Sequence, residues 1–192
     1  MPGSPASRFT CEASRGAFGV DLALPVNMRS LLLVLALLLP AAPLPVAAET
    51  ASDAIVIDIP VALATAKVVL NLDHPAFEGD EPTGLQFLKV MTARFAETGT
   101  KAELIAIFHG EAGYMLLDDG AYDRVRNWHG GNPYKAQIRA LMDKGVAFEE
   151  CGETMKVAGW TNADLIGGVK VNTGANFRII ELVQEGFVQI QP

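Results

Sequence analysis

The fold is decided by residues 146–156, which read VAFEECGETMK. A short apolar run leads through two glutamates to Cys151, and Gly152 then lets the backbone turn. This pattern predicts a buried strand that places a thiol at the edge of a sheet. The neighbouring segments then determine what surrounds that thiol.

Strands and helices alternate through the rest of the chain. Runs typical of strands occur at residues 67–73, 102–108, 146–150, 169–171 and 187–190. Helical spacing of apolar residues predicts helices over 82–99, 132–145 and 175–184, with further helical turns within 111–128 and 161–166. Because each helix supplies the crossover that parallel neighbours need, the pattern predicts an α/β sandwich with a mainly parallel sheet.

Residues 28–48 have the pattern of a secretory signal peptide. Arg29 precedes an uninterrupted apolar core at 31–39, and the small residues that follow predict cleavage after Ala48. A membrane-spanning helix needs about 20 apolar residues, and three prolines interrupt this segment before that length is reached. We therefore expect a periplasmic or secreted protein that has no membrane anchor once the signal is removed.

The other N-terminal residues are also predicted to lie outside the domain. Residues 1–27 precede Met28, an alternative start, and are interpreted as a mis-assigned extension. Residues 49–66 are interpreted as an arm or edge strand, because Pro60 would deny a central strand one of its hydrogen bonds. The domain itself is expected to span 67–192.

The composition after cleavage limits the partners. The 144 remaining residues hold 12 Lys+Arg and 20 Asp+Glu, a net charge of −8. That acidity, without any basic run, argues against nucleic acid or an anionic membrane as a partner. Cys11 is removed with the leader, so Cys151 is left unpaired in a compartment where thiols are usually paired. A free thiol at the end of a strand favours a functional role over a small buried core residue.

Candidate site residues follow the predicted strands at their carboxyl ends, where ligands bind in open parallel sheets. These ends read Asp73-His74, His109-Gly110, Cys151-Gly152 and Asn172-Thr173-Gly174. Cys151 is the candidate nucleophile, with His109 as acid, base or orienting partner. His74, Thr173 and the helix-capping Asn132 are candidates for supporting roles.

Charge near Cys151 acts in two directions. The start of the following helix and a nearby imidazolium would favour the thiolate, whereas the negative charges of Glu149, Glu150 and Glu153 would raise the pKa of the thiol where they face it. Strand alternation puts Glu149 on the same face as Cys151 and Glu150 on the opposite face. Both outcomes remain open at this point.

Other chemistries find less support. His74, His109 and Cys151 could supply three metal ligands, but their separations of 35 and 42 residues match no metal motif, and we expect no metal. The single serine after residue 48 is Ser52, in the arm, which disfavours a serine hydrolase. No glycine-rich phosphate motif follows a strand, and no cofactor is expected.

Several segments together resemble the DsrE/DsrF-like family of sulfur-relay α/β proteins. They are KVVLNLD from residue 67, FHG from 108, NPY from 132, CGETMK from 151 and GVKVNTGANFRIIELVQEGFVQI from 168. The resemblance implies a single flavodoxin-like three-layer sandwich with about five strands, assembly into homo-oligomers, and a strand-end cysteine that carries sulfur as a persulfide. Cys151 occupies that position. The export signal departs from the cytoplasmic relay proteins.

Two functional hypotheses result. In the first, the protein is an exported sulfurtransferase or sulfur carrier in which Cys151 exchanges sulfur with a thiol-containing donor or acceptor protein. In the second, it is a non-enzymatic oligomeric module that binds a small molecule or a protein, and Cys151 is buried and inert.

Overall fold

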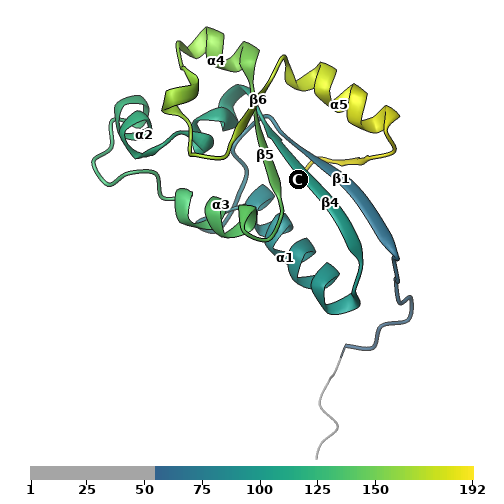
Figure 1. The fold of residues 1–192 in the computed structure, drawn as a ribbon. Helices are drawn as coiled ribbons and strands as arrows, with labels where there is room; N and C mark the ends of the chain where they lie inside the picture. The colour runs from purple at the N-terminus through teal and green to yellow at the C-terminus, as the bar shows by residue number, and fades with distance from the viewer. Residues whose placement is uncertain (1–54) are drawn as a thin grey trace, which may run out of the picture. The chain divides into compact units, whose positions relative to one another are not determined.

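The computed structural model describes residues 55–192, and its centre is a five-stranded sheet (Figure 1). The strand order is β6-β5-β4-β1-β7, and all neighbours are parallel. The strands are β1 (Thr65–Leu72), β4 (Lys101–Phe108), β5 (Ala147–Cys151), β6 (Lys170–Asn172) and β7 (Val188–Ile190). The predicted parallel sheet of about five strands is therefore confirmed.

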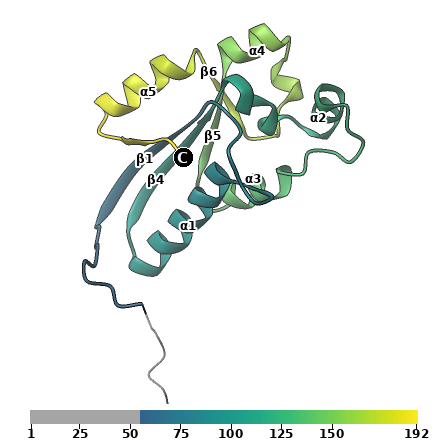
Figure 2. The same ribbon diagram turned by 180° about the vertical axis from the view of Figure 1, so that it is seen from behind.

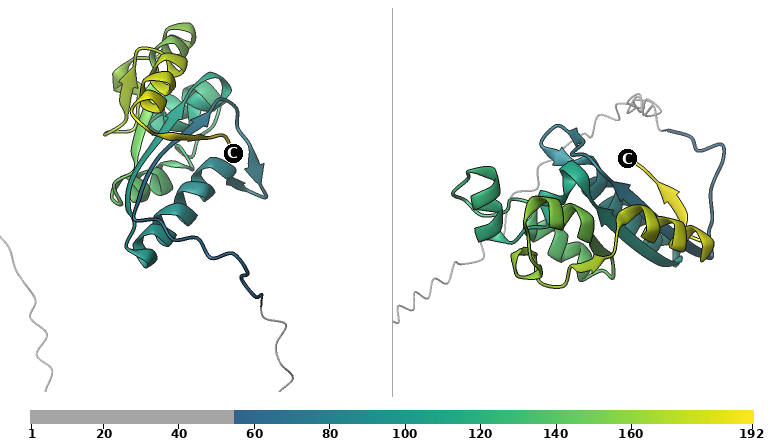
Figure 3. Two further views of the ribbon diagram at one scale, coloured as in Figure 1. Left: turned by 90° about the vertical axis from the view of Figure 1, so that its right-hand side faces the viewer. Right: turned by 90° about the horizontal axis from the view of Figure 1, so that it is seen from above.

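Helices cover both faces of the sheet, which makes a three-layer sandwich of the flavodoxin-like type (Figure 3). α1 (Thr83–Thr98) and α3 (Lys135–Met142) pack on one face, where Leu85 and Ile138 meet strand residues such as Phe148. α5 (Ala175–Gln184) packs on the other face, where Ile179 and Leu182 meet strand residues of a second, smaller core cluster. Cys151 belongs to this second cluster.

The remaining elements are short and gather at the carboxyl ends of the strands, apart from a small hairpin (Figure 2). They are η1 (Gly110–Leu116), α2 (Asp119–Arg126), α4 (Gly152–Ala158) and η2 (Asn162–Asp164), and the hairpin pairs β2 (Phe77–Glu78) with β3 (Glu81–Pro82). Thr161 and Asp164 form a capping box, which opens only a single 3-10 turn. The hairpin was not expected from the sequence.

Most predicted helices are confirmed, with differences at their ends. α1 ends at Thr98 and is capped by Gly99, whose φ of 68° is left-handed, as is common for a glycine at this position. α3 begins at Lys135, three residues after the predicted start at Asn132, because residues 132–135 form a separate turn in which the N–H of Lys135 donates to the carbonyl of Asn132 at 3.2 Å. The segment from Gly110 to Leu116 is a 3-10 helix.

α5 has the predicted bounds and presents an apolar face to solvent. Phe177, Ile180 and Val183 are 74%, 55% and 46% exposed, whereas Ile179 and Leu182 are buried against the sheet. The helix is therefore apolar on two faces, of which only one contacts the core.

The N-terminal part of the described chain, residues 55–64, contains no helix or strand before β1 begins at Thr65. The expected extension at 1–27, the signal peptide at 28–48 and the first residues of the arm lie outside the described residues. Within residues 55–192, no helix is both long enough and apolar enough to cross a membrane.

Candidate functional site

Cys151 is the last residue of β5 and is followed directly by the first residue of α4. Its side chain is 5% exposed and lies on the α5 side of the sheet, as strand alternation predicts. Gly152 is required for this junction, because a Cβ at that position would lie 2.7 Å from the carbonyl oxygen of Asn172 in the neighbouring strand. The sequence CG therefore lets the chain turn from strand to helix immediately after the thiol.

Hydrogen-bond donors surround the sulfur of Cys151. The backbone N–H of Ala175, at the start of α5, donates to Sγ at 3.3 Å. Burial raises the pKa of the Cys151 thiol, but the N–H groups of Thr154, Ala175 and Glu153 and the hydroxyl of Thr154 outweigh it, so that the pKa lies below its ordinary value. The thiolate is thus stabilised by donors from two helix starts.

Two of the acids near Cys151, Glu149 in β5 and Glu153 in α4, are paired with neighbouring cations. Glu149 is buried and forms a two-pronged ion pair with Arg178 of α5, with three N–O distances of 3.0–3.1 Å. Glu153 binds Lys156 one turn later in α4, at 2.6 Å. The negative charges of Glu149 and Glu153, which would raise the pKa of the Cys151 thiol, are therefore compensated.

Glu150 faces the opposite side of the sheet, and it is fully buried. Neither carboxyl oxygen has a hydrogen-bond partner of good geometry within residues 55–192. Burial raises the pKa of Glu150 to about 9 and outweighs the opposing effect of the backbone N–H of Cys151. The side chain is consequently neutral at neutral pH and adds no charge near the thiol.

His109 follows β4 directly and lies beside Cys151 on the next strand. Both residues come one position after Phe108 and Glu150, the last residues that β4 and β5 pair with each other. The ring is hydrogen-bonded through Nε2 to Oδ1 of Asn71 at 2.7 Å. Burial lowers the pKa of His109, and the charge of Asp73 opposes this only in part. Among the described residues, no hydrogen bond joins His109 to Cys151.

His74 and Thr173 lie at the same edge of the sheet but are exposed. Nδ1 of His74 donates to Oδ1 of Asp73 at 2.5 Å, and this hydrogen bond lowers the pKa of Asp73. Thr173 follows β6 next to Asn172, the strand partner of Cys151. The structure therefore places His74 on the β1 side of the edge and Thr173 on the β6 side.

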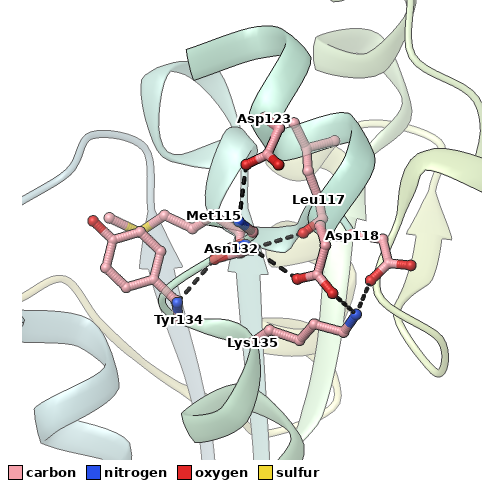
Figure 4. Close-up of polar contacts among 9 residues, drawn as sticks. Met115, Leu117, Asp118, Asp123, Asn132, Tyr134 and Lys135 are labelled. Atoms are coloured by element: carbon pink, nitrogen blue, oxygen red, sulfur yellow. Dashed lines mark hydrogen bonds and ion pairs between the residues drawn. The ribbon is translucent and has the colours of Figure 1, made fainter. Parts of the chain in front are cut away.

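Asn132 is buried in a loop cluster where all its side-chain hydrogen bonds go to backbone groups (Figure 4). Nδ2 donates to the carbonyls of Met115 and Leu117 at 2.8 and 2.6 Å, and Oδ1 accepts from the N–H of Tyr134 at 2.9 Å. Lys135 adds ion pairs to two aspartates at the start of α2. Asn132 thus joins η1 to the start of α3, and the structure gives it no contact with Cys151 or His109.

The sequence of this domain matches a known protein family. A model of the DsrE/DsrF-like family matches residues 67–192, well over half of the chain. The chain belongs to the DsrE/DsrF-like family. The resemblance seen in the sequence is thereby confirmed.

A solved structure has a similar fold. The domain is similar to the protein of unknown function MTH1491 from Methanobacterium thermoautotrophicum, with 21% identity and a TM-score of 0.53 over 66% of this chain and 99% of that chain. The ychN protein from E. coli is 16% identical, with a TM-score of 0.47 over 67% and 99% of the two chains. None of the curated proteins matches the chain.

Sequence reasoning missed several residues at the carboxyl edge of the sheet in this DsrE/DsrF-like domain. They are Asn71, Thr154, Ala175, Arg178 and Gln191. Asn71 carries a detectable signal, because it is the one polar side chain between the apolar residues Val68 and Leu72. The others gain their role from sheet order and helix placement.

No metal centre is found in the described part of the domain. Within residues 55–192, no group of three or more His, Cys, Asp or Glu side chains is placed to hold a metal ion. His74 and His109 are each engaged with a side chain of β1 or its end, rather than with Cys151.

Proposed function

We propose that this DsrE/DsrF-like protein carries sulfur on Cys151 as a persulfide and passes it to a second thiol. The observation that carries the proposal is the setting of the Cys151 sulfur, where helix-start N–H groups lower the pKa of the thiol and Glu149 is paired with Arg178. A sulfur-relay role is also what membership of the family suggests. Reactive cysteines in general occupy such donor-rich positions.

Sulfur is loaded onto Cys151 and released from it by the same reaction, the attack of a thiolate on the outer sulfur of a persulfide. The Cys151 thiolate attacks the outer sulfur of a donor persulfide, the sulfur–sulfur bond of the donor breaks, and the donor leaves as a thiolate. The product is Cys151–S–SH. An acceptor thiolate then attacks this outer sulfur, and Cys151 is the leaving group. Because a thiol of lower pKa leaves faster, the donors around Cys151 assist the second step.

Intact mass spectrometry tests the proposal. The purified full chain is incubated with polysulfide, and we expect the wild type and Cys11→Ser to gain the mass of one sulfur atom at Cys151, whereas Cys151→Ser gains none there. Cys11→Ser is the matched control, because Cys11 is the other cysteine of the chain. Equal gain in Cys151→Ser, or no gain in the wild type, would contradict the proposal.

Burial of the sulfur favours a second candidate, a binding module with an inert thiol. The Cys151 side chain is 5% exposed and packs against Ala175 in the smaller core cluster. In this case alkylation of Cys151 by iodoacetamide would be slow in the folded protein and fast in urea. Rapid alkylation of the folded protein excludes the inert module.

The exposed apolar face of α5 supports self-association. Phe177, Ile180 and Val183 form a continuous strip on the helix, and strips of this kind mark interaction sites. We infer that a second copy of the chain covers it. Sedimentation analysis should give a smaller species for Phe177→Asp than for the wild type, and an unchanged species would refute this.

Export of the protein is inferred from residues 28–48 alone. We expect the mature chain to begin at Glu49 after cleavage following Ala48. N-terminal sequencing of the protein from the periplasm or the medium checks this, and a mature protein that keeps its leader would rule it out.

A further inference from the structure

A chain of hydrogen bonds runs across the carboxyl edge of the sheet, through side chains of three neighbouring strands or their ends. His109 Nε2 meets Asn71 Oδ1 at 2.7 Å, Asn71 Nδ2 meets Gln191 Oε1 at 3.4 Å, and Gln191 Nε2 meets Asp73 Oδ1 at 3.1 Å. The sheet order makes the chain, because β1 lies between β4 and β7. Asn71 and Gln191 are 120 residues apart in the sequence.

Asp73 fixes the direction of this chain. An ionised carboxylate accepts hydrogen bonds and donates none. The hydrogen bond from His74 lowers the pKa of Asp73, so the carboxylate is ionised at neutral pH. Gln191 must therefore turn its NH2 group toward Asp73 and its oxygen toward Asn71.

The need for one donor and one acceptor in each hydrogen bond also determines which atom of His109 carries a proton. Since Gln191 presents an oxygen, Asn71 must present its NH2 group to Gln191 and its own oxygen to His109. An oxygen acceptor at 2.7 Å requires a proton on Nε2 of His109. Reversing either amide would place two acceptors, or two donors, against each other at some point along the chain.

The chain therefore selects one tautomer of His109. Burial lowers the pKa of the ring, so that it is neutral at neutral pH and carries a single proton. With that proton on Nε2, Nδ1 holds the lone pair. Asp73, at the end of β1, is the charged group that acts on the ring.

We propose that Asn71 is a positioning residue that holds His109 in the Nε2–H tautomer, so that Nδ1 is the base for the thiol chemistry of Cys151. The role of the base rests on the proposed function, whereas the tautomer does not. His109 and Cys151 lie one position beyond the last residues that β4 and β5 pair with each other, and adjacent strands are about 4.8 Å apart, so the two residues are neighbours at this edge. The proposal places the proton transfer between them, directly or through one water molecule.

Protons and electrons balance in this scheme. Nδ1 first takes the proton of the Cys151 thiol, and the thiolate so formed attacks the outer sulfur of the donor persulfide, while the imidazolium keeps its Nε2–H bond to Asn71. The donor leaves as a thiolate, which receives that proton from Nδ1. The products are Cys151–S–SH and the donor thiol, and His109 returns to its starting tautomer.

Nitrogen NMR of the histidine rings tests the tautomer. In the full chain labelled with 15N-histidine, the signals of His109 are identified by their loss in His109→Gln, and we expect the Nε2–H form. Asp73→Asn keeps the shape of the side chain but supplies an NH2 group that can donate to Gln191. The whole series of hydrogen bonds can then reverse, and the population of the Nδ1–H tautomer of His109 should rise. Asp80→Asn, in the exposed turn between β2 and β3, is the matched control and should leave the spectrum unchanged. An Nδ1–H form in the wild type, or no change in Asp73→Asn, overturns the proposal.

The rate of sulfur loading tests the base. We expect His109→Gln to load Cys151 roughly 100-fold more slowly than the wild type, within the range that general-base catalysis supplies, and Asn71→Leu to lose roughly tenfold. Loading of Asn71→Leu at the wild-type rate overturns the positioning role. If the wild type takes up no sulfur, the proposed function fails, and the NMR result on the tautomer still decides the inference about Asn71.

Discussion

Replacing Glu150 with glutamine is expected to stabilise the folded protein by an amount that grows with pH. The carboxyl is fully buried, and burial raises its pKa from 4.5 to about 9. Between these values the folded state keeps the proton and the unfolded state loses it, so stability falls as the pH rises, by about 1.4 kcal/mol per pH unit. At pH 7 the accumulated loss is about 3 kcal/mol. Glutamine removes this loss because it does not ionise.

Urea unfolding followed by circular dichroism measures the effect. The difference in unfolding free energy between Glu150→Gln and the wild type should increase by about 1.4 kcal/mol per pH unit between about pH 5 and pH 9. Any constant offset from burying the amide does not alter this slope. Glu153→Gln is the control, because Glu153 is exposed, and its difference from the wild type should not follow that slope. If the difference in unfolding free energy between Glu150→Gln and the wild type did not change with pH, the assignment of a neutral buried carboxyl would be refuted.

Three further substitutions probe the neighbourhood of the thiol and the loop cluster. Arg178→Met should destabilise the fold by about 3–5 kcal/mol in urea unfolding, because it leaves the buried charge of Glu149 unpaired, and a loss below about 1 kcal/mol would contradict this. Thr154→Val removes a hydroxyl donor from the sulfur, so the pH profile of Cys151 alkylation should move to higher pH, and an unmoved profile would contradict it. Asn132→Ala leaves buried backbone groups unsatisfied and should cost about 2 kcal/mol or more in thermal unfolding, so an unchanged melting temperature would show that water replaces the amide.

The fold was largely predictable because local patterns agree with it. α1 and its Gly99 cap, the two long central strands and the ten residues of α5 follow from apolar spacing and glycine positions. The β2–β3 hairpin was missed because each strand has two residues, too few to show alternation. The outward face of α5 was not predictable either, since Phe177 and Ile179 are both apolar and only the packing decides which one meets the sheet.

The site was predictable in position but not in its connections. Strand ends located Cys151 and His109 on one edge, because parallel strands end together. The pairing of Glu149 with Arg178 depends on which face α5 covers, and the contact of Asn71 with Gln191 depends on β7 lying next to β1. Neither arrangement leaves a local trace in the sequence. Asn132, a candidate for a supporting role, instead joins loop backbones.

The three-residue length of the edge strands β6 and β7 limits how copies of this protein can join. A long open edge offers a row of free N–H and C=O groups to a foreign strand and invites amyloid-like growth, whereas such short edges offer very few. The long strands β1 and β4 lie inside the sheet and are shielded on both sides. In the self-association proposed above, contacts between copies would therefore be made by side chains rather than by pairing of strand edges.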